Sequence, residues 1–368
     1  MAVDPSVRAG TPFSGSYDPA DVTFLLKPVA MAATGVADKE AAIQSGRRHY
    51  SEMIAPERVP DASYLALYRA ALARNGARLA QDVASLAAHL AGRRPGHDVV
   101  IVSLARAGTP IGVLLTRTLR AWGHVAHHYS VSIIRDRGID AVALAHIAAR
   151  HDPADAVFVD GWTGKGAIAA ELRAALAGRP MGFVPELAVI ADPAGQADIA
   201  ATEDDYLIAS GLLNGIVSGL VSRSILNAEM VKPGDFHACV TYPQHAGADL
   251  SRAFVDGIAP AAATAAPRTI DGHAGRRKVL REGCEAMVEA LLRQAGTRDR
   301  NRIKPGIAEA TRALLRRVPE RLLVRDPHDA DVAHLLHLAA EHQVPVDTLG
   351  HDSQYRAVAI IRSLGRDA

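Results

Sequence analysis

An apolar run that ends in Asp160 is followed by a glycine-rich turn, Gly161 to Gly166. The run predicts a strand that carries Asp160 to the carboxyl edge of a parallel sheet, where ligands of open α/β folds bind. The glycines let backbone N–H groups approach an anion closely, and the N-terminus of a helix expected from Ala167 to Leu176 favours negative charge. The spacing matches neither the Walker loop nor the dinucleotide fingerprint. The segment therefore predicts a site for another kind of phosphate-bearing ligand.

A second loop with the same plan follows the apolar run from Val99 to Val102. Thr109 is a good helix N-cap and Pro110 suits the first helical position, so a helix is expected to begin there. Arg106 then lies in a tight loop at a helix N-terminus, where its guanidinium can hold a phosphate by two parallel hydrogen bonds. Two such loops at one sheet edge predict a ligand with two phosphate groups.

Further apolar runs at Val125 to Ile134 and Leu187 to Ala191 alternate with helical patterns. This alternation predicts an α/β fold with a doubly wound parallel sheet. Apolar residues at helical spacing from Ala62 to Leu90 predict a helical hood over that sheet. A proline-containing stretch of small residues from Gly257 to Pro267 predicts a linker. The expected organisation is an N-terminal extension with the hood (1–96), the sheet domain (97–257), a linker (258–268) and a second, smaller α/β/α domain (269–368).

The two loops resemble those of the type I phosphoribosyltransferases, which use phosphoribosyl pyrophosphate and Mg²⁺. This resemblance implies that Asp160 contacts the ribose hydroxyls or the metal and that Arg106 and Arg135 stabilise the departing pyrophosphate. It further implies a possible homodimer, and it assigns substrate contacts to Ala107, Gly108, Thr109, Thr163, Gly164, Lys165 and Gly166. The family usually has a second acid beside the first, whereas this chain has Gly161 there. That change weakens the usual grip on the ribose.

Other parts of the chain give a more particular resemblance: Ser16-Tyr17 with Asp21-Val22, the segment from Asp205 to Arg223, and the C-terminal region. Together they are similar to the phosphoribosyltransferase-like proteins of bacterial tellurite-resistance operons, some of which are labelled StiP cysteine proteases. The resemblance implies an enzyme that makes or modifies a nucleoside-like metabolite, or a base linked to RNA, during stress.

Positive charge is concentrated near the C-terminus, where residues 268–368 contain 18 Lys and Arg against 14 Asp and Glu. A basic loop here runs into a helix N-terminus, which suits contacts with an RNA backbone. The region resembles the Pelota and kink-turn RNA-binding domain, although Ala308 stands where kink-turn binders have Asn. The expected RNA contacts are Arg302, Lys304, Gly306, Glu309, Arg312 and Arg316. The alternative is that the arginines form a solvated helical face.

Two other functions stay open. The chain could be a sensor that binds a phosphoribosyl ligand without catalysis and regulates RNA, or a cysteine protease that uses Cys239. A nucleophilic cysteine needs a nearby base and a lowered pKa, while the apolar surroundings of Cys239 favour a buried structural residue. Cys284 falls in the other expected domain, so a disulfide is not expected. We expect a cytoplasmic protein without a signal peptide or membrane span.

Overall fold

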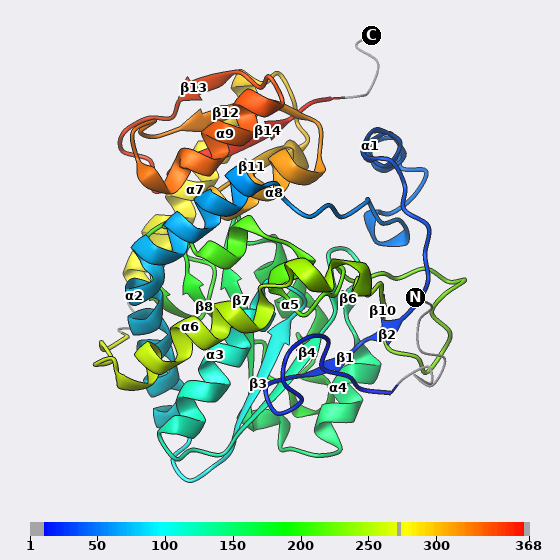
Figure 1. The fold of residues 1–368 in the computed structure, drawn as a ribbon, viewed down its shortest axis with the longest axis vertical. Coiled ribbons are helices and arrows are strands. Elements are labelled where there is room, and N and C mark those ends of the chain that lie inside the picture. The colour runs from blue at the N-terminus through cyan, green and yellow to red at the C-terminus, as the bar shows by residue number, and fades with distance from the viewer. Residues whose placement is uncertain (1–10, 271–273, 364–368) are drawn as a thin grey trace.

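The computed structural model describes residues 11–270 and 274–363. Its centre is a sheet of six parallel strands in the order β1-β4-β3-β7-β8-β9 (Figure 1). The strands are β1 (Thr23–Leu25), β4 (Ala126–Val131), β3 (Val99–Leu104), β7 (Ala156–Trp162), β8 (Leu187–Ala191) and β9 (Ile199–Thr202). The apolar runs that predicted strands are therefore confirmed as members of one parallel sheet, except that Ile133–Ile134, at the end of the run from Val125, belongs to a separate two-stranded sheet. Their side chains are almost fully buried, as expected for a sheet covered on both faces.

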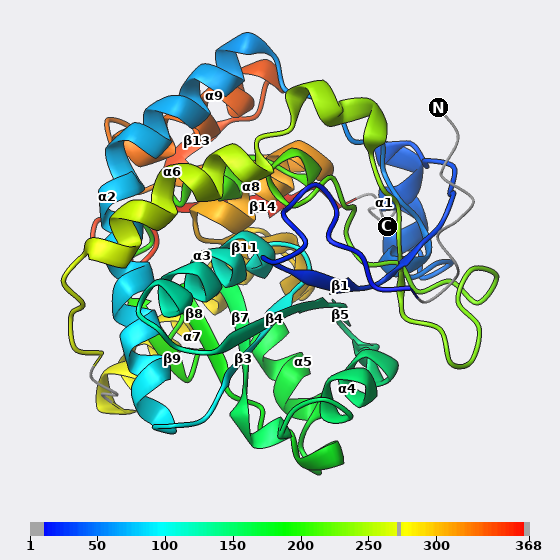
Figure 2. The same ribbon diagram turned by 60° about the horizontal axis from the view of Figure 1, so that its bottom comes forward.

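Helices cover both faces of this sheet (Figure 2). The face formed with Ile101 and Val159 packs against α2 (Ala62–Arg93), α3 (Gly108–Ala121) and α6 (Ser251–Thr264). The opposite face, with Val102 and Phe158, packs against α4 (Ala141–Ala148) and α5 (Ala167–Ala175). Helix α2 is the hood that the sequence predicts. The doubly wound α/β fold is thus confirmed.

The C-terminal domain has a four-stranded mixed sheet in the order β11-β14-β12-β13. Its strands are β11 (Ile303–Pro305), β14 (Ala357–Ile361), β12 (Pro319–Val324) and β13 (Val346–Thr348). Helix α7 (Ala274–Gln294) covers one face, and α8 (Ile307–Arg316) and α9 (Ala333–Glu341) cover the other. The second sheet gives the separate α/β/α domain expected from the sequence.

Short elements complete the described chain. They include β2 (Lys27–Pro28), β5 (Ile133–Ile134), β6 (Gly138–Ile139), β10 (Ala238–Cys239) and helix α1 (Val36–Gln44). Helix α1 is distant from the C-terminal domain in sequence but lies beside it in the fold (Figure 1). Within the described residues, no helix is both long and apolar enough to cross a membrane.

Two local expectations differ from the structure. Helix α3 begins at Gly108, one residue before the expected N-cap Thr109, whose hydroxyl instead bonds to the Ser130 hydroxyl at 2.8 Å. Helix α6 continues through Pro260 to Thr264, so most of the expected linker is helical. The alanines around Pro260 favour a helix, although small residues beside proline are also typical of a loop.

Candidate functional site at the domain junction

The glycine-rich turn connects β7 to α5 as predicted. Asp160 is half-buried near the end of β7, and its Oδ1 accepts a hydrogen bond of 2.8 Å from the Gly161 N–H. Burial raises the pKa of Asp160 to about 6. Gly166 adopts a positive φ of 86° just before α5, a conformation that suits glycine. The Thr163 hydroxyl donates to the buried Asp192 carboxylate, so this side chain already has a partner within the protein.

The C-terminal domain covers this turn. The Tyr355 hydroxyl donates to the Gly164 carbonyl at 2.7 Å, and Lys165 Nζ donates to the backbone carbonyls of Arg300 and Ile303. A side chain at Gly164 would place its Cβ 2.7 Å from Glu309 Cγ. The groups expected to hold a phosphate are therefore in contact with the chain's own C-terminal domain.

Arg106 lies in the loop after β3 and faces the same junction. Its Nη1 forms an ion pair of 3.0 Å with Glu57 and donates to the Val221 carbonyl at 2.8 Å. Ala107 is the residue before α3, and Gly108 and Thr109 begin that helix. A Cβ at Gly108 would lie 2.2 Å from the Val159 carbonyl oxygen, so only glycine fits where the two elements meet.

Arg135 follows β5 in the N-terminal domain and contacts the C-terminal domain. Its Nη1 donates to Asn301 Oδ1 at 2.8 Å, and its Nε lies 3.2 Å from Asp136. The structure thus brings Arg135, Arg106 and Asp160 to one junction, where protein groups occupy part of their hydrogen-bonding capacity. Their catalytic roles stay a prediction.

The expected RNA contacts divide into two groups. Arg302 is buried and donates to the Ile361 carbonyl at 2.7 Å and to Glu320 at 2.6 Å, so it holds the C-terminal sheet together. Glu309 and Arg312 form an ion pair of 3.0 Å, with the Arg312 guanidinium 4.7 Å from the Trp162 ring centre. Arg302 thus forms the first group, which supports the C-terminal sheet. The second group consists of the other expected contacts, including Lys304, Gly306 and Arg316, and it faces the junction between the domains. It does not form an open, solvated face.

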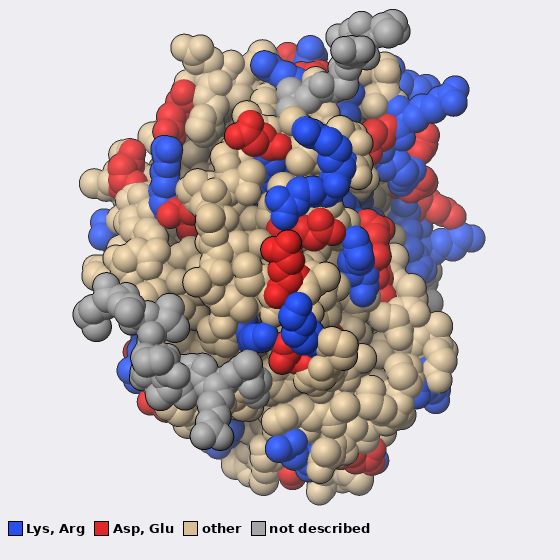
Figure 3. Space-filling model, turned by 90° about the vertical axis from the view of Figure 1, so that its right-hand side faces the viewer, with Lys and Arg blue, Asp and Glu red and all other residues tan. Residues whose placement is uncertain are grey.

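Several cations gather around this junction, and we call Lys39, Arg106, Arg223, Lys304 and Arg316 the junction cluster. Within the described residues, Lys39, Lys304 and Arg316 have neither a hydrogen bond nor an ion pair from their charged groups. Burial lowers the pKa of Lys39 to about 7 and that of Lys304 to about 8. Burial also lowers the pKa of Arg316, and Arg106 and Arg312 add to this effect. The face that carries α1 shows interspersed basic and acidic side chains (Figure 3).

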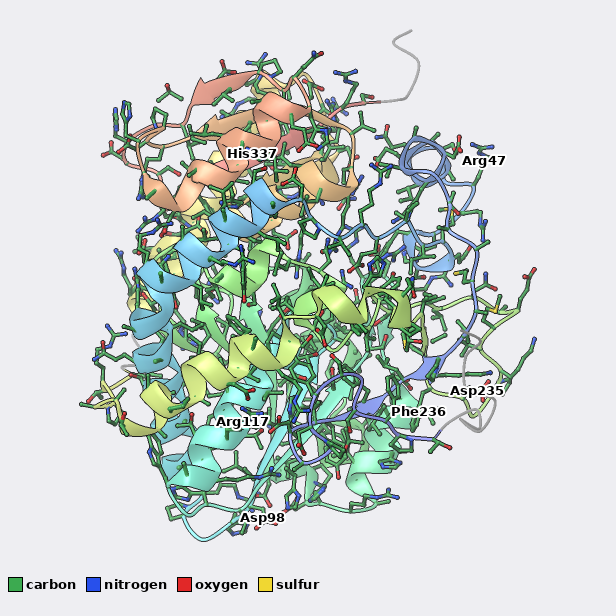
Figure 4. The ribbon with its side chains drawn as sticks, in the orientation of Figure 1. Arg47, Asp98, Arg117, Asp235, Phe236 and His337 are labelled. Carbon is green, nitrogen blue, oxygen red and sulfur yellow. The ribbon has the colours of Figure 1, made fainter. Side chains whose placement is uncertain are left out.

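The expected magnesium ion stays a prediction. The charged side chains that shift the pKa of Asp160 are those of Arg312 and Glu309. Glu309 is itself paired with Arg312. Because Mg²⁺ binds several oxygen ligands, this set of donors does not fit the ion by itself. Asp98, His127 and His151 place one ligand atom each within 4.8 Å of one another. They lie at the opposite edge of the sheet, where Figure 4 labels Asp98.

Cys239 lies on β10 with its side chain fully buried in the apolar core. Burial raises the pKa of its thiol well above the ordinary value. His237, two residues before it, uses its Nδ1 in a 2.8 Å hydrogen bond with the Ser132 hydroxyl. Cys284 is also buried, and both cysteines are free. In this conformation the Cys239 thiol is not exposed, and its raised pKa disfavours the thiolate.

The six-stranded sheet, with a mixed-sheet domain over its carboxyl edge, defines a two-domain α/β protein. Residues 15–259 match the family model described as "Tellurite-like stress resistance cysteine protease StiP", and residues 283–363 match the PELOTA RNA binding domain. The "Cysteine protease StiP" of Acinetobacter baylyi is 42% identical over 366 residues, which cover 96% of this chain and 95% of that protein. The chain belongs to the StiP family.

Similarity to solved structures is weaker. The hypoxanthine phosphoribosyltransferase of Trypanosoma cruzi is 15% identical and aligns with 35% of this chain and 77% of its own, at a TM-score of 0.28. An amino transferase from Eubacterium rectale is 14% identical, aligns with 89% of this chain and 81% of its own, and gives a TM-score of 0.22. Such values carry no argument about function.

The expected function, transfer of a phosphoribosyl group, is wrong. The family description and the relative that matches almost the whole chain both name a cysteine protease. A physical reason for the error lies in the turn from Gly161 to Gly166: its local sequence suits a phosphate, but the C-terminal domain contacts Gly164 and Lys165. Local sequence carries no sign of that contact.

Proposed function

We propose that this protein binds RNA in a stress response and that the RNA reaches Lys304 and Arg316 of the junction cluster. The match to an RNA-binding domain over residues 283–363 supports this function. The observation that carries it is that Lys304 and Arg316, from that domain, face the junction without an anionic partner among the described residues. Cations that find no carboxylate are suited to phosphates, which dominate the affinity of proteins for RNA.

Fluorescence anisotropy with a labelled single-stranded RNA tests this function. We expect Arg316→Gln and Lys304→Gln each to weaken binding. Each should also lower the slope of log affinity against log salt by about 0.7 for every phosphate that the variant no longer neutralises. The matched control is Lys278→Gln, because Lys278 is exposed on α7 and pairs with Glu282. Binding that all three variants leave unchanged would contradict the proposed RNA surface.

Cysteine proteolysis is a second candidate. One observation favours Cys239 as the nucleophile: it is the single cysteine within residues 15–259, the segment matched by the protease family. Its burial and raised thiol pKa disfavour the thiolate, which is the reactive form. Proteolysis at Cys239 therefore requires a rearrangement that exposes the thiol and brings a base to it.

Labelling by iodoacetamide, followed by peptide mass spectrometry, tests whether such a rearrangement occurs. If it does, Cys239 will be labelled in the folded protein, and Cys239→Ser will abolish cleavage of an unfolded protein substrate. Cys284→Ser is the matched control, because Cys284 is buried but lies outside the protease match. Cleavage that survives in Cys239→Ser would exclude this nucleophile.

A further inference from the structure

Lys39 is buried without a counter-charge. It lies on α1 with only 8% of its surface exposed, and within the described residues its ammonium group has no hydrogen bond or ion pair. Burying an unpaired charge is costly, and proteins normally avoid it. The neighbouring Glu40 cannot offset this charge, because its carboxylate is held by Arg317, with one contact of 2.6 Å.

Two further cations lie near Lys39 and also lack a carboxylate partner. Arg223 donates through Nη2 to the carbonyls of Tyr50 and Met53, and its Nη1 is buried without a hydrogen bond. The Arg316 guanidinium makes no hydrogen bond or ion pair within the described residues. Both guanidinium groups are close enough to Lys39 to lower its pKa. Three cations from α1, the segment after β9 and α8 thus lie within electrostatic range of one another, and none of them has a carboxylate partner among the described residues.

The carboxylates beside these cations are already in use. Glu57 interacts electrostatically with Arg316, but it is paired with Arg106 and also accepts a hydrogen bond from the Gly215 N–H. Glu40 is paired with Arg317. Positive charge therefore exceeds negative charge in this part of the junction. Lys39 is buried and the two arginines are partly buried, and repulsion among cations is stronger in such a medium than in water, so the arrangement is suited to an anion.

We propose that Lys39, Arg223 and Arg316 form a binding site for a phosphate dianion, the terminal phosphate of a nucleotide. Such a phosphate comes from two sources, a free nucleotide or the 5′ end of an RNA, and the second source rests on the proposed RNA binding. Arg223 and Arg316 supply planar donors that suit phosphate oxygens, while Lys39 supplies a point charge.

Burial favours a terminal phosphate over one within the RNA chain. A phosphodiester carries a single charge and continues on both sides, so it needs an open path past its binding residues. Lys39 is almost fully covered, and such a group is more easily reached by the end of a chain. A terminal phosphate also carries up to two charges near neutral pH, which better offset three cations.

The test compares two RNAs of the same sequence, one with a 5′-phosphate and one with a 5′-hydroxyl, together with AMP as the free nucleotide. Isothermal titration calorimetry measures each affinity for the full chain and for Lys39→Met, Arg316→Gln and Lys278→Met. We expect the 5′-phosphate to improve RNA affinity by about tenfold or more in the unchanged protein. That advantage should fall toward onefold in Lys39→Met and Arg316→Gln, and it should persist in Lys278→Met.

The outcomes separate this site from the proposed function. Equal binding of both RNAs, with no binding of AMP, would overturn the terminal-phosphate site while leaving RNA binding intact. Binding of AMP that Lys39→Met weakens, without binding of either RNA, would support the site for a free nucleotide and overturn the proposed RNA function. Thermal melting of each variant checks the fold, and the more conservative Arg223→Lys provides a further test if Lys39→Met is unstable.

Discussion

At the scale of single residues, Lys39 connects stability to binding. Its folded pKa of about 7 lies below the ordinary lysine value of 10.5. Between these values the unfolded chain binds more protons than the folded chain, so the free energy of unfolding rises as pH rises through this window. A cation is thus retained where it opposes folding. This cost is understandable if the residue serves a ligand.

Lys39→Met should therefore stabilise the protein without ligand. We expect the gain in free energy of unfolding to be about 1 kcal/mol or more at and below pH 7, and to disappear as pH approaches the ordinary lysine pKa. Urea denaturation at about pH 6 and about pH 10 measures the difference. The exposed Lys278→Met should change stability by less than about 0.5 kcal/mol at both values. A loss of stability in Lys39→Met at low pH would contradict the assigned burial cost.

At the scale of elements, the sequence is informative where a pattern is local. Alternation of apolar runs with helical patterns predicts β3, β7, β8, α2 and α5, because burial on both faces of a parallel sheet produces continuous apolar strands. The turn from Asp160 to Gly166 also has the predicted strand-turn-helix form. The contact partner of this turn cannot be predicted from local sequence. The Tyr355 hydroxyl, which donates a hydrogen bond to the turn, lies nearly two hundred residues away in sequence.

The cations of the proposed phosphate site illustrate the same limit. In the sequence Arg316 is one of many C-terminal arginines, whereas Lys39 stands in an ordinary helical segment and no motif gives Arg223 a role. What distinguishes them is the lack of a carboxylate partner after folding. That property depends on which distant elements meet, so it cannot be recognised from spacing. The local hint is the excess of arginine around α8.

At the scale of the whole molecule, the Asp205 carboxylate is one of several groups that join the two domains. Asp205 follows β9 in the N-terminal domain, yet it accepts hydrogen bonds from the Ile307 N–H at 3.0 Å and the Arg356 N–H at 2.9 Å. Ile307 begins α8, so Asp205 also places negative charge at a helix N-terminus. It thereby fixes the helix that carries Arg316 against the sheet domain. The geometry of the junction cluster depends on this contact.

Asp205→Ala should therefore loosen the junction without unfolding either domain. The buried Ile307 N–H would lose its acceptor, at a cost of about 1–3 kcal/mol, and the partly buried Arg356 N–H would lose its acceptor at a smaller cost. We expect calorimetry to separate the unfolding of the two domains, and hydrogen exchange to rise at Ile307 and Arg356. Asp326→Ala is the matched control, because Asp326 is exposed and accepts only within its own turn, from the His328 N–H. A single unfolding transition with unchanged exchange in Asp205→Ala would show that other contacts hold the domains, and that the cluster does not rely on this carboxylate.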